Sequence, residues 1–428
     1  MVQFMKSVRV AAMAISAVPK DMKISESASV QAVVKTIAAD TMSYYKGSAT
    51  NYVDLEAPYW WWQSGALFGA MSDYSHYTGD KSYDQTIATA LLAQTGPKYD
   101  FMSPAHEGQM GNDDLGFWGF AVMSAAERNL PQSESSVPSW LKMSENIHAS
   151  LASRWDTTTC GGGLLWQIFA SNPNGLNYKN SVSNGAFFQL SARLARATGN
   201  QTYMDWANKI FDWSTGVGFV DQNFHVVDGA DKRDDCKKVN PVSFTYTNGI
   251  YMYGAALLAN MTSDRKWIDR TQKFVEASKA YFGPTATTPD ILYEPACESG
   301  GTCNVDMKSH KGQLARFMWA STLMQPAIRP AVEMLLLPSA QAAASTCTGG
   351  ANGSQCSHRW WTGAFDNDTG LGQEMCALET IQGILAGSAA PPLRGNDIKD
   401  VRVPKQGASA PAPKRLVREE RRLATRRA

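Results

Sequence analysis

The sequence predicts an all-α fold in which pairs of helices form a closed ring. Helical periodicity dominates the 428 residues, whereas the alternation of apolar and polar residues typical of strands is scarce. A short pattern also recurs: residues 77–83 (YTGDKSY) resemble residues 197–203 (ATGNQTY), and residues 261–267 (MTSDRKW) form a looser copy. Each copy separates two helix-like segments. We therefore expect helical hairpins, which together bury surface that a single hairpin leaves exposed.

The chemistry of the repeated pattern fits the turn of a hairpin. Segments rich in small and apolar residues precede the three copies, at residues 65–77, 184–197 and 248–260. In each copy a Gly or Ser can end the first helix, and an Asp or Asn can cap the second. An amphipathic segment follows each copy. Between the hairpins lie loops rich in Gly and aromatic residues, which in a ring of helices gather at one end and line a cleft.

The chain divides into one long helical region and two shorter ends. Residues 28–386 contain no internal linker and are expected to form one domain, although the length alone would allow two or three. Residues 1–27 are expected to be a weak signal-like or disordered segment, with Lys6 and Arg9 before a short apolar stretch. Residues 387–428 are Pro-rich and then basic, and are expected to be a disordered tail.

Composition limits the classes of function. The 40 basic and 39 acidic residues nearly balance, so the net charge of +1 gives no support to nucleic-acid binding. No apolar run approaches 18 residues, so no transmembrane segment is expected. Seven cysteines and four glycosylation sequons indicate a secreted protein. The sequons are at Asn200, Asn260, Asn352 and Asn367.

Two adjacent carboxylates, Asp113 and Asp114, are the strongest candidates for chemistry. They follow Gly111 and Asn112 at what the pattern predicts to be the start of a helix. Asp and Asn there can act simply as helix caps. The alternative is a retaining glycosidase pair, which needs two carboxyl groups roughly 5 Å apart. The helix dipole would keep one carboxylate ionised, and that charge would hold the proton on the other.

Five segments in order carry a resemblance to a known family. They are GNDD, WDTTTCGGGLLWQI, NYKNSVSNG, ARATGNQTY and GLGQEMCALETIQ. With them, residues 28–386 resemble glycoside hydrolase family 76, and most closely its fungal cell-wall group of mannan endo-1,6-α-mannosidases. The resemblance implies an (α/α)6 barrel that cleaves or transfers α-1,6-linked mannose chains with retention of configuration. It also implies that Asp113 is the nucleophile and Asp114 the acid/base.

The resemblance implies further cleft residues more loosely. For the aromatic members, packing in the core remains an equal alternative to sugar stacking. Lys311 is expected in a cleft element or as a solvated surface charge. We expect no cofactor, a mannose-containing glycan as partner, a monomer, and a secreted or cell-wall location without support for a lipid anchor in the tail. The expected substrate-binding set is Trp61, Trp62, Gln63, Asn112, Trp166, Tyr178, Asn180, Asn184 and Asp228.

Three positions depart from the family pattern, in which a Glu, a Gln and an Arg are expected. Here these positions are Gln63, Leu115 and Leu165. Lost polar groups would weaken or shift substrate binding, so an inactive mannan-binding or wall-scaffold protein remains the alternative. A polysaccharide lyase would need a Tyr, His or Lys base, and the Asp pair argues against it.

Metal sites are not expected, because the six histidines have no paired ligand spacing. Residues 366–370 imitate the start of a calcium loop, but its sixth position is Leu371 rather than Gly and its twelfth is Ala377 rather than Glu. The acidic loop 228–235 is the remaining calcium candidate. Two short cysteine loops favour the disulfides Cys297–Cys303 and Cys347–Cys356. Cys160 and Cys236 then form a long-range pair, which leaves Cys376 as a buried free thiol.

Overall fold

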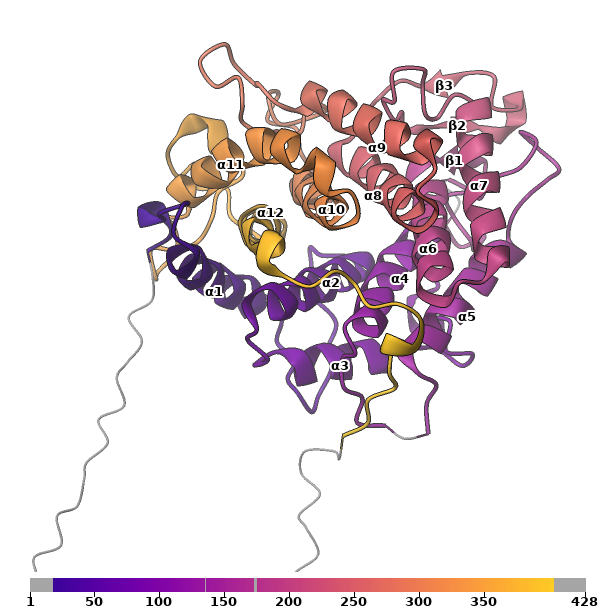
Figure 1. Ribbon diagram of the computed structural model, residues 1–428, viewed down its shortest axis with the longest axis horizontal. Coiled ribbons are helices and arrows are strands. Elements are labelled where there is room, and N and C mark those ends of the chain that lie inside the picture. The colour runs from indigo at the N-terminus through magenta and orange to yellow at the C-terminus, as the bar shows by residue number, and fades with distance from the viewer. Residues whose placement is uncertain (1–17, 135, 173–174, 404–428) are drawn as a thin grey trace, which may run out of the picture.

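The computed structural model describes residues 18–134, 136–172 and 175–403, and it forms a ring of helical hairpins (Figure 1). An inner and an outer layer of helices alternate along the chain, and α1 packs on α12 to close the ring. The predicted (α/α)6 fold class is therefore confirmed. The inner helices are α2 (Trp61–Thr78), α4 (Asn112–Glu127), α6 (Ser181–Thr198), α8 (Thr245–Thr262), α10 (His310–Met324) and α12 (Leu371–Gln382). The outer helices are α1 (Ser27–Ser43), α3 (Asp84–Ala93), α5 (Trp140–Ser153), α7 (Gln201–Gly216), α9 (Arg265–Ser278) and α11 (Arg329–Thr346).

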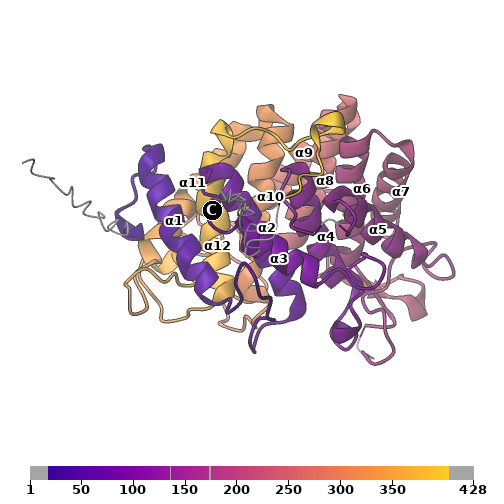
Figure 2. The same ribbon diagram turned by 90° about the horizontal axis from the view of Figure 1, so that it is seen from below.

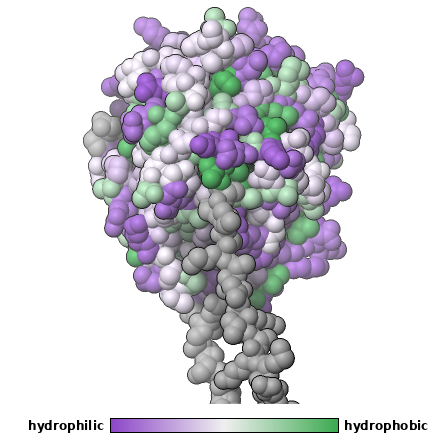
Figure 3. All heavy atoms as spheres, turned by 90° about the vertical axis from the view of Figure 1, so that its left-hand side faces the viewer, coloured by the Kyte–Doolittle hydropathy of each residue, from purple (hydrophilic) through white to green (hydrophobic). Residues whose placement is uncertain are grey.

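Burial explains why the two layers have different sequences. Every residue of α12 and almost every residue of α6 is buried, and the polar side chains among them, such as Glu379 and Arg193, are buried as well. The outer helix α9 buries only one face, which includes Trp267, Thr271 and Phe274. On the side of α1 and α11, hydrophobic residues are scattered among hydrophilic ones (Figure 3). The core therefore lies between the two layers and within the ring.

The predicted hairpin turns are present. Gly79, Gly199 and Ser263 end the inner helices α2, α6 and α8 in the left-handed conformation. The side chains of Asn200 and Asp264 cap α7 and α9, accepting hydrogen bonds from the backbone N–H two residues on. In the first copy, α3 begins at Asp84, three residues later than capping by Asp80 predicts. There Asp80 accepts hydrogen bonds from the Ser82 N–H and from the Tyr74 hydroxyl of α2.

A small antiparallel sheet, absent from the prediction, lies among the loops. Its strands are β1 (Tyr178–Asn180), β2 (Gly229–Asp231) and β3 (Val239–Asn240), in that order. The sheet extends further by single contacts: Trp166 N donates to Tyr178 O at 2.7 Å, and Gln167 bridges to Gly111. A continuous set of backbone hydrogen bonds therefore joins the sheet to the start of α4.

The chain beyond α12 corrects one predicted boundary. Residues 389–403, expected to begin a disordered tail, pack as a strap across one end of the ring, opposite the long loops (Figure 2). Ala390 O pairs with His76, Leu393 N donates to Glu127 O, and Gln132 N donates to Val401 O. Backbone hydrogen bonds hold this segment in place, and the Pro-rich composition does not predict them. Residues 404–428 of the predicted tail lie outside the described residues.

The predicted N-terminal segment also divides in two. Residues 1–17 lie outside the described part of the chain. Residues 19–21 form a short 3-10 helix against α11, with Pro19 buried. The packed region therefore begins earlier than the predicted residue 28.

All three predicted disulfides are confirmed. The Cα atoms of Cys160 and Cys236 lie 5.4 Å apart, and those of Cys297 and Cys303 lie 4.8 Å apart. Cys347 bonds to Cys356, and Cys376 is a buried free thiol in α12. Within the described ranges, no helix has the length and apolar character needed to cross a membrane.

Candidate active site

The two adjacent aspartates occupy the first turn of α4. Gly111 is the N-cap residue in extended conformation, and its N–H donates to Asp114 Oδ2 at 2.5 Å. The N–H of Asp114 donates to Asp113 Oδ1 at 3.0 Å. Free N–H groups at a helix start favour negative charge, so this end of α4 stabilises an ionised carboxylate. The predicted helix start is therefore confirmed, although the N-cap residue is Gly111 and the side chain of Asn112 does not cap the helix.

Gly111 allows both carboxylates to approach the same point. A β-carbon on Gly111 would collide with Asp113 Oδ1 and would lie 3.1 Å from Asp114 Oδ2. It would also lie 3.0 Å from the carbonyl oxygen of Trp166. One oxygen of each carboxyl group lies close to the position of this β-carbon, so the two carboxyl groups are near each other. Their separation fits the roughly 5–5.5 Å of retaining glycosidases better than the wider spacing of inverting glycosidases.

The environment gives the two carboxyl groups different pKa values. Burial raises the pKa of Asp113 to about 7, although hydrogen bonds from backbone N–H groups and from the Trp166 side chain act to lower it. Burial, followed by the charge of Asp113, raises the pKa of Asp114 well above its usual value. Asp113 therefore ionises first while Asp114 keeps its proton. This division suits one nucleophile and one proton donor.

The pair lies in a cavity of about 560 Å³ at the loop end of the ring. Four predicted site residues line this cavity: Trp62, Trp166 and the two aspartates. A second cavity of about 490 Å³ lies between the C-terminal ends of α2 and α4, and Asp84 is the single carboxylate among its lining residues. The second cavity therefore lacks a pair of acids, and we assign the candidate active site to the first.

The predicted tryptophans contact carboxylates in the cavity. The indole N–H of Trp62 donates to Asp306 Oδ1 at 3.0 Å, and its ring packs against Phe117 with the ring centres 4.6 Å apart. The Trp166 side chain donates a hydrogen bond to Asp113. These rings therefore orient acidic groups as well as lining the space that a sugar would occupy.

Several residues from the expected binding set lie behind the cavity. Trp61 is buried, donates to Gln94 and stacks on His106. Gln63 is fully buried, and its Oε1 accepts from the backbone N–H of Trp60, so Gln63 caps α2. These two residues hold the start of α2, and neither lines the cavity.

The expected asparagines are also buried, and their side chains form hydrogen bonds that hold the loops in place. Asn112 donates to Leu165 O at 2.8 Å and accepts from Arg154 Nε at 2.7 Å. Asn184 exchanges hydrogen bonds with the backbone of Leu164, and Asn180 caps α6. Sequence alone cannot distinguish a side chain that holds a cleft loop from one that contacts the substrate, because both lie in the same segments.

Tyr178 and Asp228 form a pair beside the cavity. The hydroxyl of Tyr178 donates to Asp228 Oδ2 at 2.6 Å, and Asn240 donates to the same oxygen at 3.0 Å. The charge of Asp228 contributes to the raised pKa of Tyr246, which lines the cavity. The pair therefore stands close to the cavity, although neither residue is among its lining residues.

The three departures from the family pattern do not lie on the cavity. Gln63 and Leu115 are fully buried, and Leu165 is half-buried and receives the Asn112 hydrogen bond through its carbonyl group. None of the three is among the residues that line the cavity. The expectation that they weaken sugar binding therefore has no structural basis.

Other lining residues were not predicted. Asp306 faces the cavity from the loop after the Cys297–Cys303 disulfide, and its charge raises the pKa of both catalytic candidates. Tyr246 and His310 stack with their ring centres 4.0 Å apart. Trp60 is half-exposed at the cavity, next to the predicted Trp61. The run of three tryptophans could have indicated Trp60, whereas only the tertiary fold brings in Asp306.

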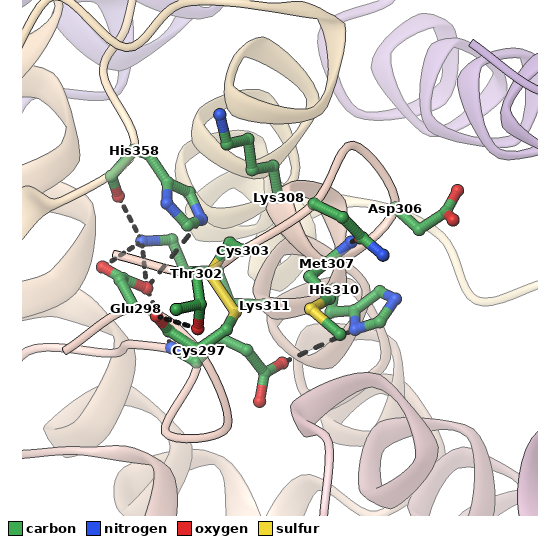
Figure 4. Close-up of a disulfide and its surroundings, with 12 residues drawn as sticks. Cys297, Glu298, Thr302, Cys303, Asp306, Met307, Lys308, His310, Lys311 and His358 are labelled. Carbon is green, nitrogen blue, oxygen red and sulfur yellow. Dashed lines mark hydrogen bonds and ion pairs between the residues drawn. A yellow bond between two sulfur atoms is a disulfide. The ribbon is translucent and has the colours of Figure 1, made fainter. Parts of the chain in front are cut away.

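A buried ionic cluster supports the loop that carries Asp306. Lys311, expected in the cleft or as a solvated charge, is fully buried in α10. Its ammonium group lies 3.1 Å from Glu298 Oε1 and donates to the carbonyl oxygen of His358 (Figure 4). Glu298 follows Cys297 directly. The ion pair and the disulfide therefore fix the same loop from two sides.

The candidate calcium loops use their carboxylates internally. Asp228 is bonded to Tyr178 and Asn240, and Asp231 pairs with Arg233. Asp366 accepts hydrogen bonds from Arg359. Across the described part of the chain, no group of three or more His, Cys, Asp or Glu side chains gathers as metal ligands would.

Comparisons with known proteins show which family this chain belongs to. The model of glycosyl hydrolase family 76 matches residues 29–396. Mannan endo-1,6-alpha-mannosidase DCW1 of Candida glabrata is 40% identical over 376 residues, covering 87% of this chain and 83% of that protein. The crystal structure of Dfg5 from Chaetomium thermophilum in complex with glucosamine is 36% identical, with a TM-score of 0.83 over 87% of this chain and 94% of that one. The GH76A alpha-1,6-mannanase from Salegentibacter sp. HEL1_6, 20% identical, shares the fold with a TM-score of 0.65 over 83% and 98%.

Proposed function

The chain belongs to glycosyl hydrolase family 76, and we propose that it is a retaining, endo-acting glycosidase or transglycosidase of α-1,6-linked mannan. The observation that carries this proposal is the Asp113–Asp114 pair, whose two carboxyl groups share one cavity and differ in proton affinity. Relatives named mannan endo-1,6-alpha-mannosidase support the choice of substrate.

The proposed reaction has two steps. Asp113 attacks the anomeric carbon from the β face, while Asp114 gives its proton to the glycosidic oxygen that leaves. Asp114 then takes a proton from water or from a sugar hydroxyl, which attacks the glycosyl-enzyme from the α face. Two inversions restore the α configuration. The second nucleophile decides between hydrolysis and transfer.

The shape of the site supports action within a chain. The cavity is open at the loop end of the ring, and Trp60 stands half-exposed at it. Sugar units on either side of the cleaved bond can therefore extend out of the cavity. We propose action in the assembly or breakdown of a fungal cell wall, by a secreted monomer at the wall or cell surface; the relatives named mannan endo-1,6-alpha-mannosidase come from fungi.

The alternative is a mannan-binding or scaffold protein without activity. Its main support was the loss of polar cleft groups at positions 63, 115 and 165, which all lie away from the cavity. The geometry therefore favours the enzyme.

Incubation with linear α-1,6-mannan tests the proposal. Product size on a calibrated column should fall rapidly, as expected for internal cleavage, and the first reducing ends should be α by proton NMR. An added α-1,6-mannobiose acceptor would reveal transfer as longer products. Firm binding of mannan with no product after prolonged incubation would favour the scaffold protein.

A further inference from the structure

Lys179 is a fully buried lysine in β1 whose ammonium group is surrounded by one loop. It donates to the carbonyl oxygens of Asp156 (3.2 Å), Thr159 (2.8 Å) and Gly162 (2.5 Å). It also lies 3.0 Å from Asp156 Oδ2, and the exposed fraction of its side chain is 0%. All four oxygen atoms belong to residues 156–163. The proposed reaction assigns no role to this group.

The backbone of residues 156–163 has the shape of a loop that encloses a cation. Asp156 N donates to Gly163 O at 3.0 Å and closes the loop. Four consecutive residues, 160–163, have positive φ angles of 55°, 63°, 149° and 101°, which three glycines make accessible. Carbonyl oxygens turned inward without a partner would be costly to bury. The ammonium group of Lys179 is the shared partner of all three carbonyl groups, and Thr159 O also accepts from the Gly162 N–H at 3.2 Å.

Asp156 completes the charge balance of the loop. Its carboxylate accepts hydrogen bonds from the Thr158 N–H (2.8 Å) and from the hydroxyls of Thr158 (2.5 Å) and Thr159 (2.6 Å). Burial acts to raise the pKa of Asp156, but these bonds and the one from Lys179 outweigh it and hold the pKa well below its usual range. The loop therefore holds one cation and one anion, both hydrogen-bonded.

The loop is connected to the proposed nucleophile, Asp113, through the residues that follow it. Residues 164–167 follow it, and Trp166 N donates to Tyr178 O, next to Lys179. On the other side, Asn112 N donates to Trp166 O at 2.8 Å. The Trp166 side chain then donates its hydrogen bond to Asp113. Lys179 and Asp113 are therefore linked through one short segment.

We propose that Lys179 is a positioning residue, whose ammonium group serves as the internal cation of loop 156–163 and so holds Trp166 against Asp113. The Cys160–Cys236 disulfide ties the outer side of the loop to residues 228–240, and Cys160 N donates to Asp235. It provides no partner for the inward carbonyl groups. The proposal rests on the proposed function only in treating Asp113 as the nucleophile.

The main test is Lys179→Met, which keeps the apolar stem and removes the charge. We expect kcat/KM on α-1,6-mannan to fall roughly tenfold to a hundredfold, the cost of a small misplacement near the chemistry. The acidic limb of the pH profile should move to higher pH, because a weakened Trp166 hydrogen bond lets the pKa of Asp113 rise. Trp166→Phe should move that limb in the same direction. Lys237→Met, at an exposed lysine beside the same disulfide, should leave rate and limb unchanged.

A measurement independent of activity separates this proposal from the proposed function. Hydrogen exchange of the amides in residues 156–166 should be faster in Lys179→Met than in the parent, with α8 unchanged. If the parent does not cleave mannan, the proposed function fails while hydrogen exchange still tests the loop. A folded Lys179→Met protein with the parent's exchange rates would overturn the proposal. An active Lys179→Met enzyme whose acidic limb of kcat/KM is unchanged would also overturn it.

A second variant covers the case in which Lys179→Met does not fold. Asp156→Asn retains every carbonyl group of the loop but removes the ion pair with Lys179, together with one acceptor of the threonine hydrogen bonds. It should speed exchange in residues 156–166 and move the acidic limb in the same direction by a smaller amount. Unchanged exchange in Asp156→Asn would overturn the proposal in that case.

Discussion

Trp62 and Asp306 meet in the cavity, where the indole N–H donates to the carboxylate at 3.0 Å although 244 residues separate them in the chain. This bond brings a third carboxyl group beside the pair at the start of α4. Its charge raises the pKa of both Asp113 and Asp114. Asp306 therefore helps to keep the proton on Asp114.

Asp306→Asn should shift the active pH range to lower pH, because the Asp306 charge raises the pKa of both Asp113 and Asp114. Without the negative charge, the pKa of Asp114 falls, so the acid loses its proton at lower pH. We expect the alkaline limb of kcat/KM to move down by roughly one unit. Asn can still accept the Trp62 hydrogen bond, so the fold should remain. Asp269→Asn, on the outer helix α9, is the control, and equal profiles for both variants would contradict the role of Asp306.

Gly111→Ala should abolish most activity. The backbone of Gly111 is extended, which alanine also adopts, but the added β-carbon would collide with Asp113 Oδ1. A displaced nucleophile should lower kcat at least about 10²-fold. Gly108 also lines the cavity, and a β-carbon there meets nothing within 4 Å. Gly108→Ala is thus the matched control, and a fully active Gly111→Ala enzyme would refute this geometry.

Glu294 should make stability depend on pH. Burial raises its pKa to about 8, so the folded protein holds a proton that the unfolded chain has released above about pH 4.5. The stability that this proton contributes is complete below about pH 4.5 and is lost as the pH rises through about 8. Glu294→Gln, which cannot lose that proton, should therefore gain stability relative to the parent from pH 5 to pH 8. Urea unfolding at several pH values measures this difference, and exposed Glu276→Gln should show none.

The four glycosylation sequons should behave differently when the protein is made in a yeast secretory pathway. Asn260 is partly buried, donates to Met324 O and accepts from Arg196, so its amide group is not free. Asn200, Asn352 and Asn367 are exposed. Mass spectrometry of glycopeptides should find glycans at the exposed positions and none at Asn260. A glycan on Asn260 would mean that this contact does not form before modification.

The limits of the sequence prediction have physical causes. The helical hairpins and the Asp pair depend on local patterns, namely helical periodicity, turn residues and adjacent acids, so they were predictable. Asp306 reaches the cavity through a loop fixed by Lys311 and Glu298, and no local pattern records that contact. Buried asparagines such as Asn184 share their segments with true cleft residues, which explains why they were assigned to the substrate.

The structural role of these polar residues also changes the meaning of the departures from the family pattern. Gln63, expected to weaken sugar binding, caps α2 through the Trp60 N–H at 2.8 Å. A sequence pattern reports that a polar residue is present, whereas only the fold determines whether it faces solvent, substrate or backbone.

The configuration of azide adducts tests the assignment of Asp113 and Asp114 most directly. With an α-1,6-mannobiosyl fluoride, whose leaving group needs no proton donor, azide should restore turnover to Asp113→Ala by direct displacement and yield the β-azide. Asp114→Ala still forms the glycosyl-enzyme, so azide should attack it from the α face and yield the α-azide. The reverse pattern, or parent-level turnover of both variants on mannan without azide, would contradict the assignment.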